Sequence, residues 1–382
     1  MIDNVKRIII FVVYDFEGKV DLYLEKLLSE NKNISDRLVV VVNGGIQDKG
    51  IEILTKYSND VYFRKNNGFD GGAYKDVLIN FVGIDAIKKY DELVLMNDTF
   101  YGPFYSWKIV FDEMKSEKCD YWGLTRSEEQ CMSSHGLKSH IQGYFFCFRK
   151  NILDNTEFWD FWRKLPYASN HDEAVEEYEI GLNTWLQKRK YEGNSYLDIC
   201  GGKALIERKT NPYRDELEDI IMSYKCPIIK RKAISFRSIK KVKNVEAFIR
   251  KSYKYDFDCV WENWIRYDMS DNNSTVSVEE LKIFCESHNN IYIYGSGKMG
   301  NILMDIIESL GLGYKTNFVI TSGETAENVF LIDEITLEEL DGIIIGVGSE
   351  FMGDVYKIAI RKMNPKNIFI PNRRQRQEYS IK

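Results

Sequence analysis

The chain of 382 residues is long enough for two domains and a connector, and its apolar fraction of 44% excludes an intrinsically disordered protein. A formal net charge of −6 at pH 7 argues against a protein that binds nucleic acid over its whole surface. The seven cysteines form no Cys-x-x-Cys pair, which favours reduced thiols over a disulfide framework. The sequence shows neither a signal-peptide pattern nor an apolar run of ~20 residues, so we predict a cytoplasmic protein.

Four apolar, β-branched runs in the first hundred residues predict strands that are buried on both faces. Helix-period segments separate them, and this alternation predicts a parallel α/β sheet with right-handed crossovers. The predicted strands are Arg7–Tyr14, Arg37–Val42, Val61–Arg64 and Glu92–Met96.

Each of these strands ends in a polar residue. The ends are Asp15, Asn43, Asn66 and the pair Asn97 and Asp98. Turn formation alone would account for any one of them. Parallel strands, however, place their carboxyl ends at one edge of the sheet, where open α/β sheets bind ligands. The sequence therefore predicts a binding site at this edge.

A glycine-rich turn lies between the third and fourth strands and precedes a helical segment. Paired glycines let a backbone approach a ligand closely, and the free N–H groups of a helix start bind phosphate. A carboxylate at the end of the next strand, Asp98, can hold a metal ion or a sugar hydroxyl. We therefore predict a site for a sugar joined to a diphosphate, whose turn residues are Asn67, Gly68, Asp70, Gly71 and Gly72.

The next part of the chain predicts further elements beside this site. Residues 105–115 predict a helix, residues 120–124 and 142–148 predict strands, and the polar residues 125–140 predict a loop over the sugar site. An acid-rich segment, residues 171–182, then opens another helix. Acidic residues are common in a first helical turn, so a solvated face is the alternative to a functional role.

Residues 227–255 are strongly basic within an acidic chain. Lys230 and Lys232 could neutralise a diphosphate, and the later basic residues could hold the protein to an anionic inner leaflet at ~1 kcal/mol each. A solvated basic helix is the alternative.

The C-terminal part predicts a small Rossmann-like domain. A strand at residues 291–294 leads through the G-x-G-x-x-G of residues 295–300 into a helix at 301–310. The following strand, 317–320, ends in Thr321 without an acid that could hold a ribose, so we expect no NAD here. Three further predicted strands complete the domain: 331–333, 342–347 and 367–370.

Five motifs within residues 5–235 together resemble the rhamnan synthesis protein F family: NGFDGGAY, LMNDTFYGP, HIQGYFFCFRK, EYEIGL and CPIIKRK. The resemblance implies a GT-A-like domain over residues 1–235. The basic segment and the glycine motif predict a helical connector over 236–285 and the Rossmann-like domain over 286–382. The resemblance also implies an inverting glycosyltransferase of bacterial surface polysaccharide synthesis. Such an enzyme would move a sugar, L-rhamnose from dTDP in this family, to an oligosaccharide or lipid-linked acceptor.

The resemblance also suggests residue roles. Many such enzymes carry Asp-x-Asp for a divalent ion, whereas this chain has Asn97-Asp98-Thr99 with one carboxylate. Either Asp98 holds Mg²⁺ or Mn²⁺, or cations and backbone N–H groups neutralise the phosphates. Inverting transfer needs a carboxylate that takes the acceptor proton opposite the leaving diphosphate. Glu179 is the predicted base, with Asp172 as the second choice.

Two other functional classes remain open from the sequence. An NAD-dependent sugar oxidoreductase would use the loop of residues 295–300, and a non-catalytic scaffold would use the basic segment to tether polysaccharide enzymes at the membrane. Neither needs the cluster between Asn67 and Asp98, which is why we favour the transferase. Its expected partners are a nucleotide-diphosphate sugar, the acceptor and an anionic membrane surface, but no nucleic acid.

Overall fold

The computed structural model describes residues 5–127, 139–202, 216–235, 239–270, 278–347 and 349–371. Its contacts divide the chain into two compact units. The first unit comprises Met1–Ala233 and Ala247–Cys259, and the second comprises Ile234–Glu246 and Val260–Lys382. Residues 128–138 of the predicted loop lie outside the described residues.

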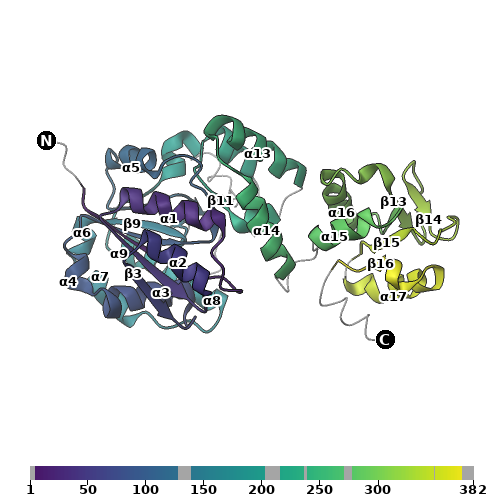
Figure 1. Ribbon diagram of the computed structural model, residues 1–382. Coiled ribbons are helices and arrows are strands. Elements are labelled where there is room, and N and C mark those ends of the chain that lie inside the picture. Colours follow the sequence, from purple (N-terminus) through teal and green to yellow (C-terminus); the bar gives the residue numbers. More distant parts are fainter. Residues whose placement is uncertain are drawn as a thin grey trace. The chain divides into compact units, whose positions relative to one another are not determined.

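The first unit is built on a seven-stranded sheet with the order β10-β6-β9-β4-β1-β2-β3 (Figure 1). Strand β9 runs antiparallel to both of its neighbours, and the other pairings are parallel. The predicted mostly parallel α/β fold is thus confirmed. The strands are β1 (Arg7–Val13), β2 (Arg37–Asn43), β3 (Asp60–Arg64), β4 (Glu92–Asn97), β6 (Tyr121–Gly123), β9 (Phe145–Arg149) and β10 (Gly193–Ser195).

The four strands predicted from apolar runs lie side by side at one end of this sheet, in the order β4-β1-β2-β3. In β1 every residue from Ile8 to Val13 is buried, because helices cover both faces of the sheet. Phe11 of this strand is level with Val40 on one side and Met96 on the other. This register brings the carboxyl ends of β1, β2 and β4 to the same edge.

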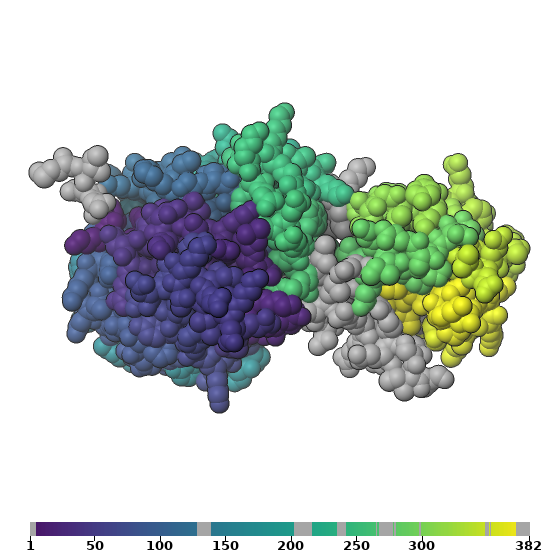
Figure 2. Space-filling model, in the orientation of Figure 1, coloured from purple at the N-terminus to yellow at the C-terminus, as the bar shows by residue number. Residues whose placement is uncertain are grey.

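Helices α1 and α2 contact each other and cover one face of the sheet, where they hide the strands in the space-filling view (Figures 1 and 2). Helix α3 contacts β1 and β2, and its residues Ala73 and Tyr74 pack into the core shared with α7 and α9. The α-helices of this part are α1 (Leu22–Ile34), α2 (Asp48–Tyr57), α3 (Phe69–Asp76), α4 (Ile84–Ile87), α5 (Trp107–Lys115), α6 (Lys150–Leu153), α7 (Thr156–Lys164), α8 (His171–Ala174), α9 (Gly181–Lys188) and α12 (Arg231–Ser235). The π-helical turns are η1 (Val77–Phe81), η2 (Val175–Ile180), η3 (Asp198–Gly202) and η4 (Asp219–Ser223).

Two short antiparallel pairs were not predicted from the sequence. Strand β5 (Phe100–Tyr101) pairs with β11 (Ile229–Lys230), and β7 (Arg126–Ser127) pairs with β8 (His140–Ile141). Two-residue strands have no periodicity that a sequence could reveal. The strand predicted at 142–148 begins later, at Phe145, because Gly143 and Tyr144 form a turn after β8.

The second unit contains a five-stranded, fully parallel sheet with the order β14-β13-β12-β15-β16, so the parallel α/β arrangement predicted for this part is present. A Cβ on Gly300 would lie 1.8 Å from the carbonyl oxygen of Gly295, so close packing of the turn against α16 accounts for this glycine. The strands are β12 (Ile291–Tyr294), β13 (Thr316–Ile320), β14 (Val329–Leu331), β15 (Gly342–Ile345) and β16 (Ile368–Phe369). The helices are α15 (Val278–Glu286), α16 (Lys298–Ser309), α17 (Ser349–Lys362) and the 3₁₀ turns η5 (Gly313–Lys315) and η6 (Pro365–Asn367).

The stretch predicted as a separate connector, residues 236–285, is divided between the two units. It contains α13 (Ile239–Tyr253) and α14 (Asp258–Ser270), and two of the three unit boundaries fall within these helices. Val245 and Ile249 of α13 are fully buried, although the segment is rich in lysine.

Candidate active site

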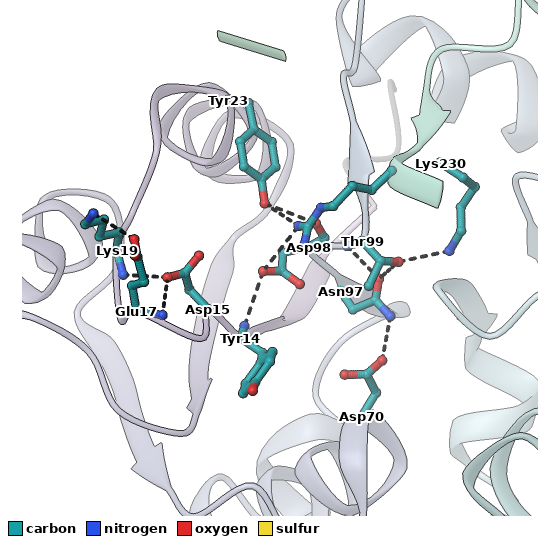
Figure 3. Close-up of polar contacts among 11 residues, drawn as sticks. Tyr14, Asp15, Glu17, Lys19, Tyr23, Asp70, Asn97, Asp98, Thr99 and Lys230 are labelled. Atoms are coloured by element: carbon teal, nitrogen blue, oxygen red, sulfur yellow. Dashed lines mark hydrogen bonds and ion pairs between the residues drawn. The ribbon is translucent and has the colours of Figure 1, made fainter. Parts of the chain in front are cut away.

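The glycine turn and the end of β4 meet through Asn97. Its Nδ2 donates a hydrogen bond of 2.6 Å to Oδ2 of Asp70, at the start of α3 (Figure 3). Its Oδ1 accepts hydrogen bonds from the backbone N and the Oγ1 of Thr99, at 3.1 and 2.7 Å. The glycine turn therefore lies next to the end of β4, as predicted.

Asp98 is buried directly beside this junction, with its side chain 6% exposed. Its Oδ2 accepts a hydrogen bond of 3.2 Å from the backbone N of Tyr14, at the end of β1, and lies 3.9 Å from Nη2 of Arg231. Burial raises the pKa of Asp98 to about 7; Arg231 lowers this pKa and the neighbouring Asp70 raises it. The positive charge of Arg231 is thus too small to offset the effect of burial on the pKa of Asp98.

Asp70 is the second carboxylate of the cluster. Burial raises its pKa, against the hydrogen bond from Asn97 and the positive charge of Lys230, which lower it. The negative charge of Asp70 raises the pKa of Asp98, and the charge of Glu179 raises the pKa of Asp70.

Two cations reach the cluster from the segment around β11. Nζ of Lys230 donates a hydrogen bond of 2.9 Å to Oγ1 of Thr99 and lies 4.0 Å from the centre of the Tyr144 ring. Nη2 of Arg231 donates to the backbone oxygen of Asp98 at 2.7 Å. Sequence reasoning selected Lys230 and Lys232, but Lys232 is exposed and Arg231 is the residue that faces Asp98.

The contacts of Lys230 and Arg231 explain their placement. The pairing of β11 with β5, two residues after Asp98, brings this segment to the tip of β4. Burial lowers the pKa of Lys230 to about 8, although Glu179 and Asp70 both raise it. Two carboxylates from separate parts of the chain thus favour the charged form of Lys230.

Glu179, the predicted base, belongs to the same cluster. Its side chain is 21% exposed and projects from the π-helical turn η2. Oε1 lies 3.0 Å from Nε2 of His140, and Oε2 accepts a hydrogen bond of 2.7 Å from the backbone N of Gly143. His140 and Gly143 were not among the predicted site residues, since nothing in the sequence marks which loop residues face Glu179.

Asp172, the second choice for the base, is placed differently. Its side chain is fully exposed, and its contact is His171, whose Nδ1 lies 3.8 Å from Oδ1. An exposed carboxylate on the first turn of α8 fits the solvated face that was the alternative reading of this segment. We therefore keep Glu179 and leave Asp172 out of the proposal below.

Several predicted donor-binding residues have structural roles in the turns. Asn43 donates from Nδ2 to Oδ1 of Asn66 at 2.8 Å and accepts a hydrogen bond from Arg64 at Oδ1. Arg64 also donates to the carbonyl oxygen of Asn67 at 2.6 Å. Oδ1 of Asp15 accepts from the backbone N atoms of two residues of its own loop, at 3.0 and 2.9 Å, as Figure 3 shows. These contacts hold the loops and give no support for direct donor binding.

The glycine turn is likewise shaped by protein packing. Gly68 precedes α3, whose glycines Gly71 and Gly72 are both buried. A Cβ on Gly71 would lie 2.9 Å from Cβ of Tyr178, and one on Gly72 would lie 2.4 Å from the carbonyl oxygen of Asn67. Close packing of α3 therefore accounts for this glycine pair, and the close approach of a ligand here stays a prediction.

This packing predicts a loss of stability when Gly72 is replaced. Gly72→Ala should lower the free energy of unfolding by about 1–3 kcal/mol, because the backbone oxygen of Asn67 cannot yield as a side chain can. Urea unfolding measures the effect. Gly45→Ala is the matched control, since a Cβ at Gly45 meets no atom within 4 Å. Equal stability of the two variants would contradict the packing argument.

The charges at Lys230 predict a pH dependence of ligand binding. The amine carries its charge below about pH 8 and loses it above, so the affinity for a nucleoside diphosphate should fall as pH rises from 7 to 9. The loss is expected to reach about tenfold per pH unit above 8. Calorimetric titration with dTDP or UDP at both pH values measures it. Lys230→Arg should abolish this dependence and Lys232→Ala should keep it, whereas a pH-independent affinity of the wild type would contradict the assignment.

A divalent metal ion in this cluster would need several donor atoms close together. Among the described residues, no group of three or more His, Cys, Asp or Glu side chains could hold such an ion. Asp70 and Asp98 nevertheless offer two neighbouring hard oxygen donors, and a cation would offset the charge that burial disfavours. Carboxylate oxygens are the donor type that Mg²⁺ and Mn²⁺ prefer, and phosphate oxygens and water would have to complete the coordination.

A surface hollow of about 680 Å³ lies elsewhere in the first unit, lined by residues of η1, α4 and α7. Its residues Ile84 to Lys89 precede β4, so the hollow is at the amino end of this strand. Asp98 follows the carboxyl end, about 20 Å away for a strand of this length. The hollow is therefore separate from the acid and base cluster.

The first unit is a mostly parallel α/β fold whose strands end in polar residues at one edge. The chain belongs to the rhamnan synthesis protein F family, which matches residues 38–339. The described part of the chain contains no helix that is long and apolar enough to cross a membrane.

Individual known proteins are more distant. The uncharacterized protein y4gN of Sinorhizobium fredii is 27% identical over 185 residues, which cover 47% of this chain and 45% of that protein. Virulence protein VirA of Vibrio anguillarum is 27% identical over 185 residues, covering 47% and 56%. The chain thus spans about half the length of the curated relatives it matches. A solved cytidylyltransferase from Leptospira borgpetersenii is 14% identical with a TM-score of 0.30, covering 50% of this chain and 74% of that one; so distant a likeness supports no transfer of function.

Proposed function

We propose that the protein is an inverting glycosyltransferase that uses a nucleotide-diphosphate sugar, with L-rhamnose as the sugar and a bacterial surface polysaccharide as the acceptor. One observation carries the proposal. Three carboxylates (Asp70, Asp98 and Glu179) and two cations (Lys230 and Arg231) come together at the carboxyl edge of a parallel sheet, and their charges act on one another.

In the proposed reaction the acceptor hydroxyl attacks the anomeric carbon of the donor sugar. Glu179 takes the proton of this hydroxyl as the new carbon–oxygen bond forms. The bond between the anomeric carbon and the phosphate oxygen breaks on the opposite face, and its electron pair leaves with the nucleoside diphosphate. The cations of Lys230 and Arg231 offset the charge that develops on the departing phosphate.

Asp98 and Asp70 would hold a divalent ion in this site. A bound Mg²⁺ or Mn²⁺ supplies Lewis-acid stabilisation of phosphate oxygens. Without a metal, the two carboxylates would face the donor phosphates as like charges, so the cations alone would have to overcome this repulsion. Activity that rises with added Mg²⁺ or Mn²⁺ and disappears with a chelator is the expected outcome.

A lipid-linked acceptor would also determine where the protein acts. We place the enzyme in the cytoplasm at the inner face of the membrane, where a lipid-linked acceptor would be available. Three exposed lysines support contact with anionic lipid, and each would contribute ~1 kcal/mol to binding. Two lie in α13 and one directly follows it: Lys243, Lys251 and Lys254.

A panel of nucleotide sugars tests the proposal. The purified chain is heated with dTDP-L-rhamnose and with UDP- and GDP-sugars, and release of nucleoside diphosphate is followed with water as the acceptor. Stabilisation by RT ln(1 + [L]/Kd) together with slow hydrolysis of one donor is the expected result. A chain that neither binds nor hydrolyses any donor would exclude the transferase and favour the scaffold, and reduction of added NAD by a sugar would favour the oxidoreductase.

A further inference from the structure

We propose that His140 is a positioning residue that aims the carboxylate of Glu179; this inference rests on the proposed role of Glu179 as the base. The two oxygens of this carboxylate have one partner each from a single short segment, residues 140–143. Oε1 lies 3.0 Å from Nε2 of His140, and Oε2 accepts from the backbone N of Gly143 at 2.7 Å.

The carboxylate is enclosed by this segment. The His140 side chain is 6% exposed. A Cβ on Gly143 would lie 2.7 Å from Oε2 of Glu179, so the carboxylate occupies the space that a side chain at this position would need. Glu179 is thus fixed on two sides, and only groups aimed at its remaining face can exchange a proton with it.

The backbones that carry His140 and Glu179 are joined independently of their side chains. Asn183, which is fully buried, accepts at Oδ1 from the backbone N of Ile141 at 2.9 Å. Its Nδ2 donates to the carbonyl oxygens of Ile141 and Glu179, at 2.9 and 2.7 Å. The segment should therefore keep its place when the imidazole is removed, which allows the role of His140 to be tested separately from folding.

The chemistry of the pair assigns the direction of the hydrogen bond. A carboxylate only accepts, so Nε2 of His140 is the atom that donates a hydrogen bond to Oε1. A donor of this kind favours the charged form of the acid, which is the form that can take a proton from the acceptor hydroxyl. Glu179 also interacts electrostatically with two other charged groups, Lys230 from β11 and Asp70 from α3.

The local helix geometry supports a functional arrangement. Glu179 lies in the π-helical turn η2, which leads directly into α9. Wide turns of this kind often occur at functional sites, because the extra residue redirects the side chains that follow. Here the turn places Glu179 towards residues 140–143 while Tyr178, one position earlier, donates its hydroxyl to the carbonyl oxygen of Gly143 at 3.0 Å.

The experiment uses the full chain and the nucleotide sugar that the panel shows to be hydrolysed fastest. His140→Phe removes the donor and keeps a ring of similar size, while His140→Gln keeps an N–H donor. We expect His140→Phe to lower kcat about 10- to 100-fold, the loss typical of an orienting partner, with the donor KM changed less than about twofold. The acid limb of its pH–rate profile should move to higher pH, and His140→Gln should restore most of the rate.

Two further variants separate positioning from mere packing. Gln187→Ala removes a hydrogen bond of 2.9 Å to the carbonyl oxygen of Ser139, next to His140, without touching Glu179, and should retain kcat and the pH profile. In a Glu179→Gln background, His140→Phe should cause no further loss, because its effect acts through the carboxylate.

The outcomes distinguish the inference from the function on which it rests. Wild-type kcat and pH profile in His140→Phe, or losses that multiply in the double variant, would overturn the positioning role alone. A Glu179→Gln variant with wild-type turnover would overturn the base assignment, and the role of His140 with it.

Discussion

Replacing Glu179 with glutamine is expected to lower the turnover of the donor by about 10²–10⁴-fold, the contribution typical of a general base. Glutamine keeps the size and the hydrogen-bonding reach of the side chain but cannot take a proton. Donor binding should change little, because the cations and carboxylates at the tip of β4 are untouched. Nucleoside diphosphate release measures turnover, and calorimetric titration with the donor measures binding.

The same helical turn offers controls for this prediction. Glu177→Gln changes an exposed carboxylate two residues away and should leave turnover intact. Asp172→Asn should also be neutral, since its side chain is fully exposed. If Asp172→Asn lost turnover while Glu179→Gln kept it, the base would have to be reassigned.

Asp98→Asn is expected to lower donor turnover by about 100-fold or more, because it removes the buried charge that would hold the metal and orient the phosphates. The variant keeps an oxygen that can accept the hydrogen bond from the backbone N of Tyr14. Release of nucleoside diphosphate from the best donor, with Mg²⁺ or Mn²⁺ present, measures the loss. Normal turnover in this variant would exclude Asp98 from the site.

The same substitution should increase stability at high pH. The pKa of Asp98 is about 7 in the folded chain, above its value of about 4 in an unfolded one. The folded state therefore holds this proton more tightly, and its contribution to the free energy of unfolding falls between pH 4 and 7 by up to about 1.4 kcal/mol per pH unit. The asparagine side chain of the variant does not ionise, so the difference in stability should favour the variant at pH 8 and shrink towards pH 4.

Urea unfolding at pH 5 and pH 8 measures this difference. An inactive variant that is at least as stable as the wild type at pH 8 would show that lost turnover does not arise from unfolding. A variant that is less stable than the wild type at pH 8 would contradict the burial argument for Asp98.

The sequence by itself determined the parallel part of the first unit and the edge at which its site lies. Runs such as Arg7–Tyr14 are apolar at nearly every position, and only strands covered on both faces accommodate such runs. Because parallel strands share one carboxyl edge, the acids after β1 and β4 had to lie near each other. The small parallel sheet of the second unit followed from the same reasoning.

Only the tertiary structure decided which side chains complete the cluster and which serve the loops. Arg231 faces Asp98 because a two-residue strand, β11, pairs with β5, and so short a pairing leaves no pattern in the sequence. His140 meets Glu179 because the turn after β8 folds against η2. Gly72 and Asn43 looked like ligand contacts, but their neighbours in space are protein atoms. Local patterns specify burial and strand direction, whereas contacts between segments about 40 to 130 residues apart depend on how the whole chain packs.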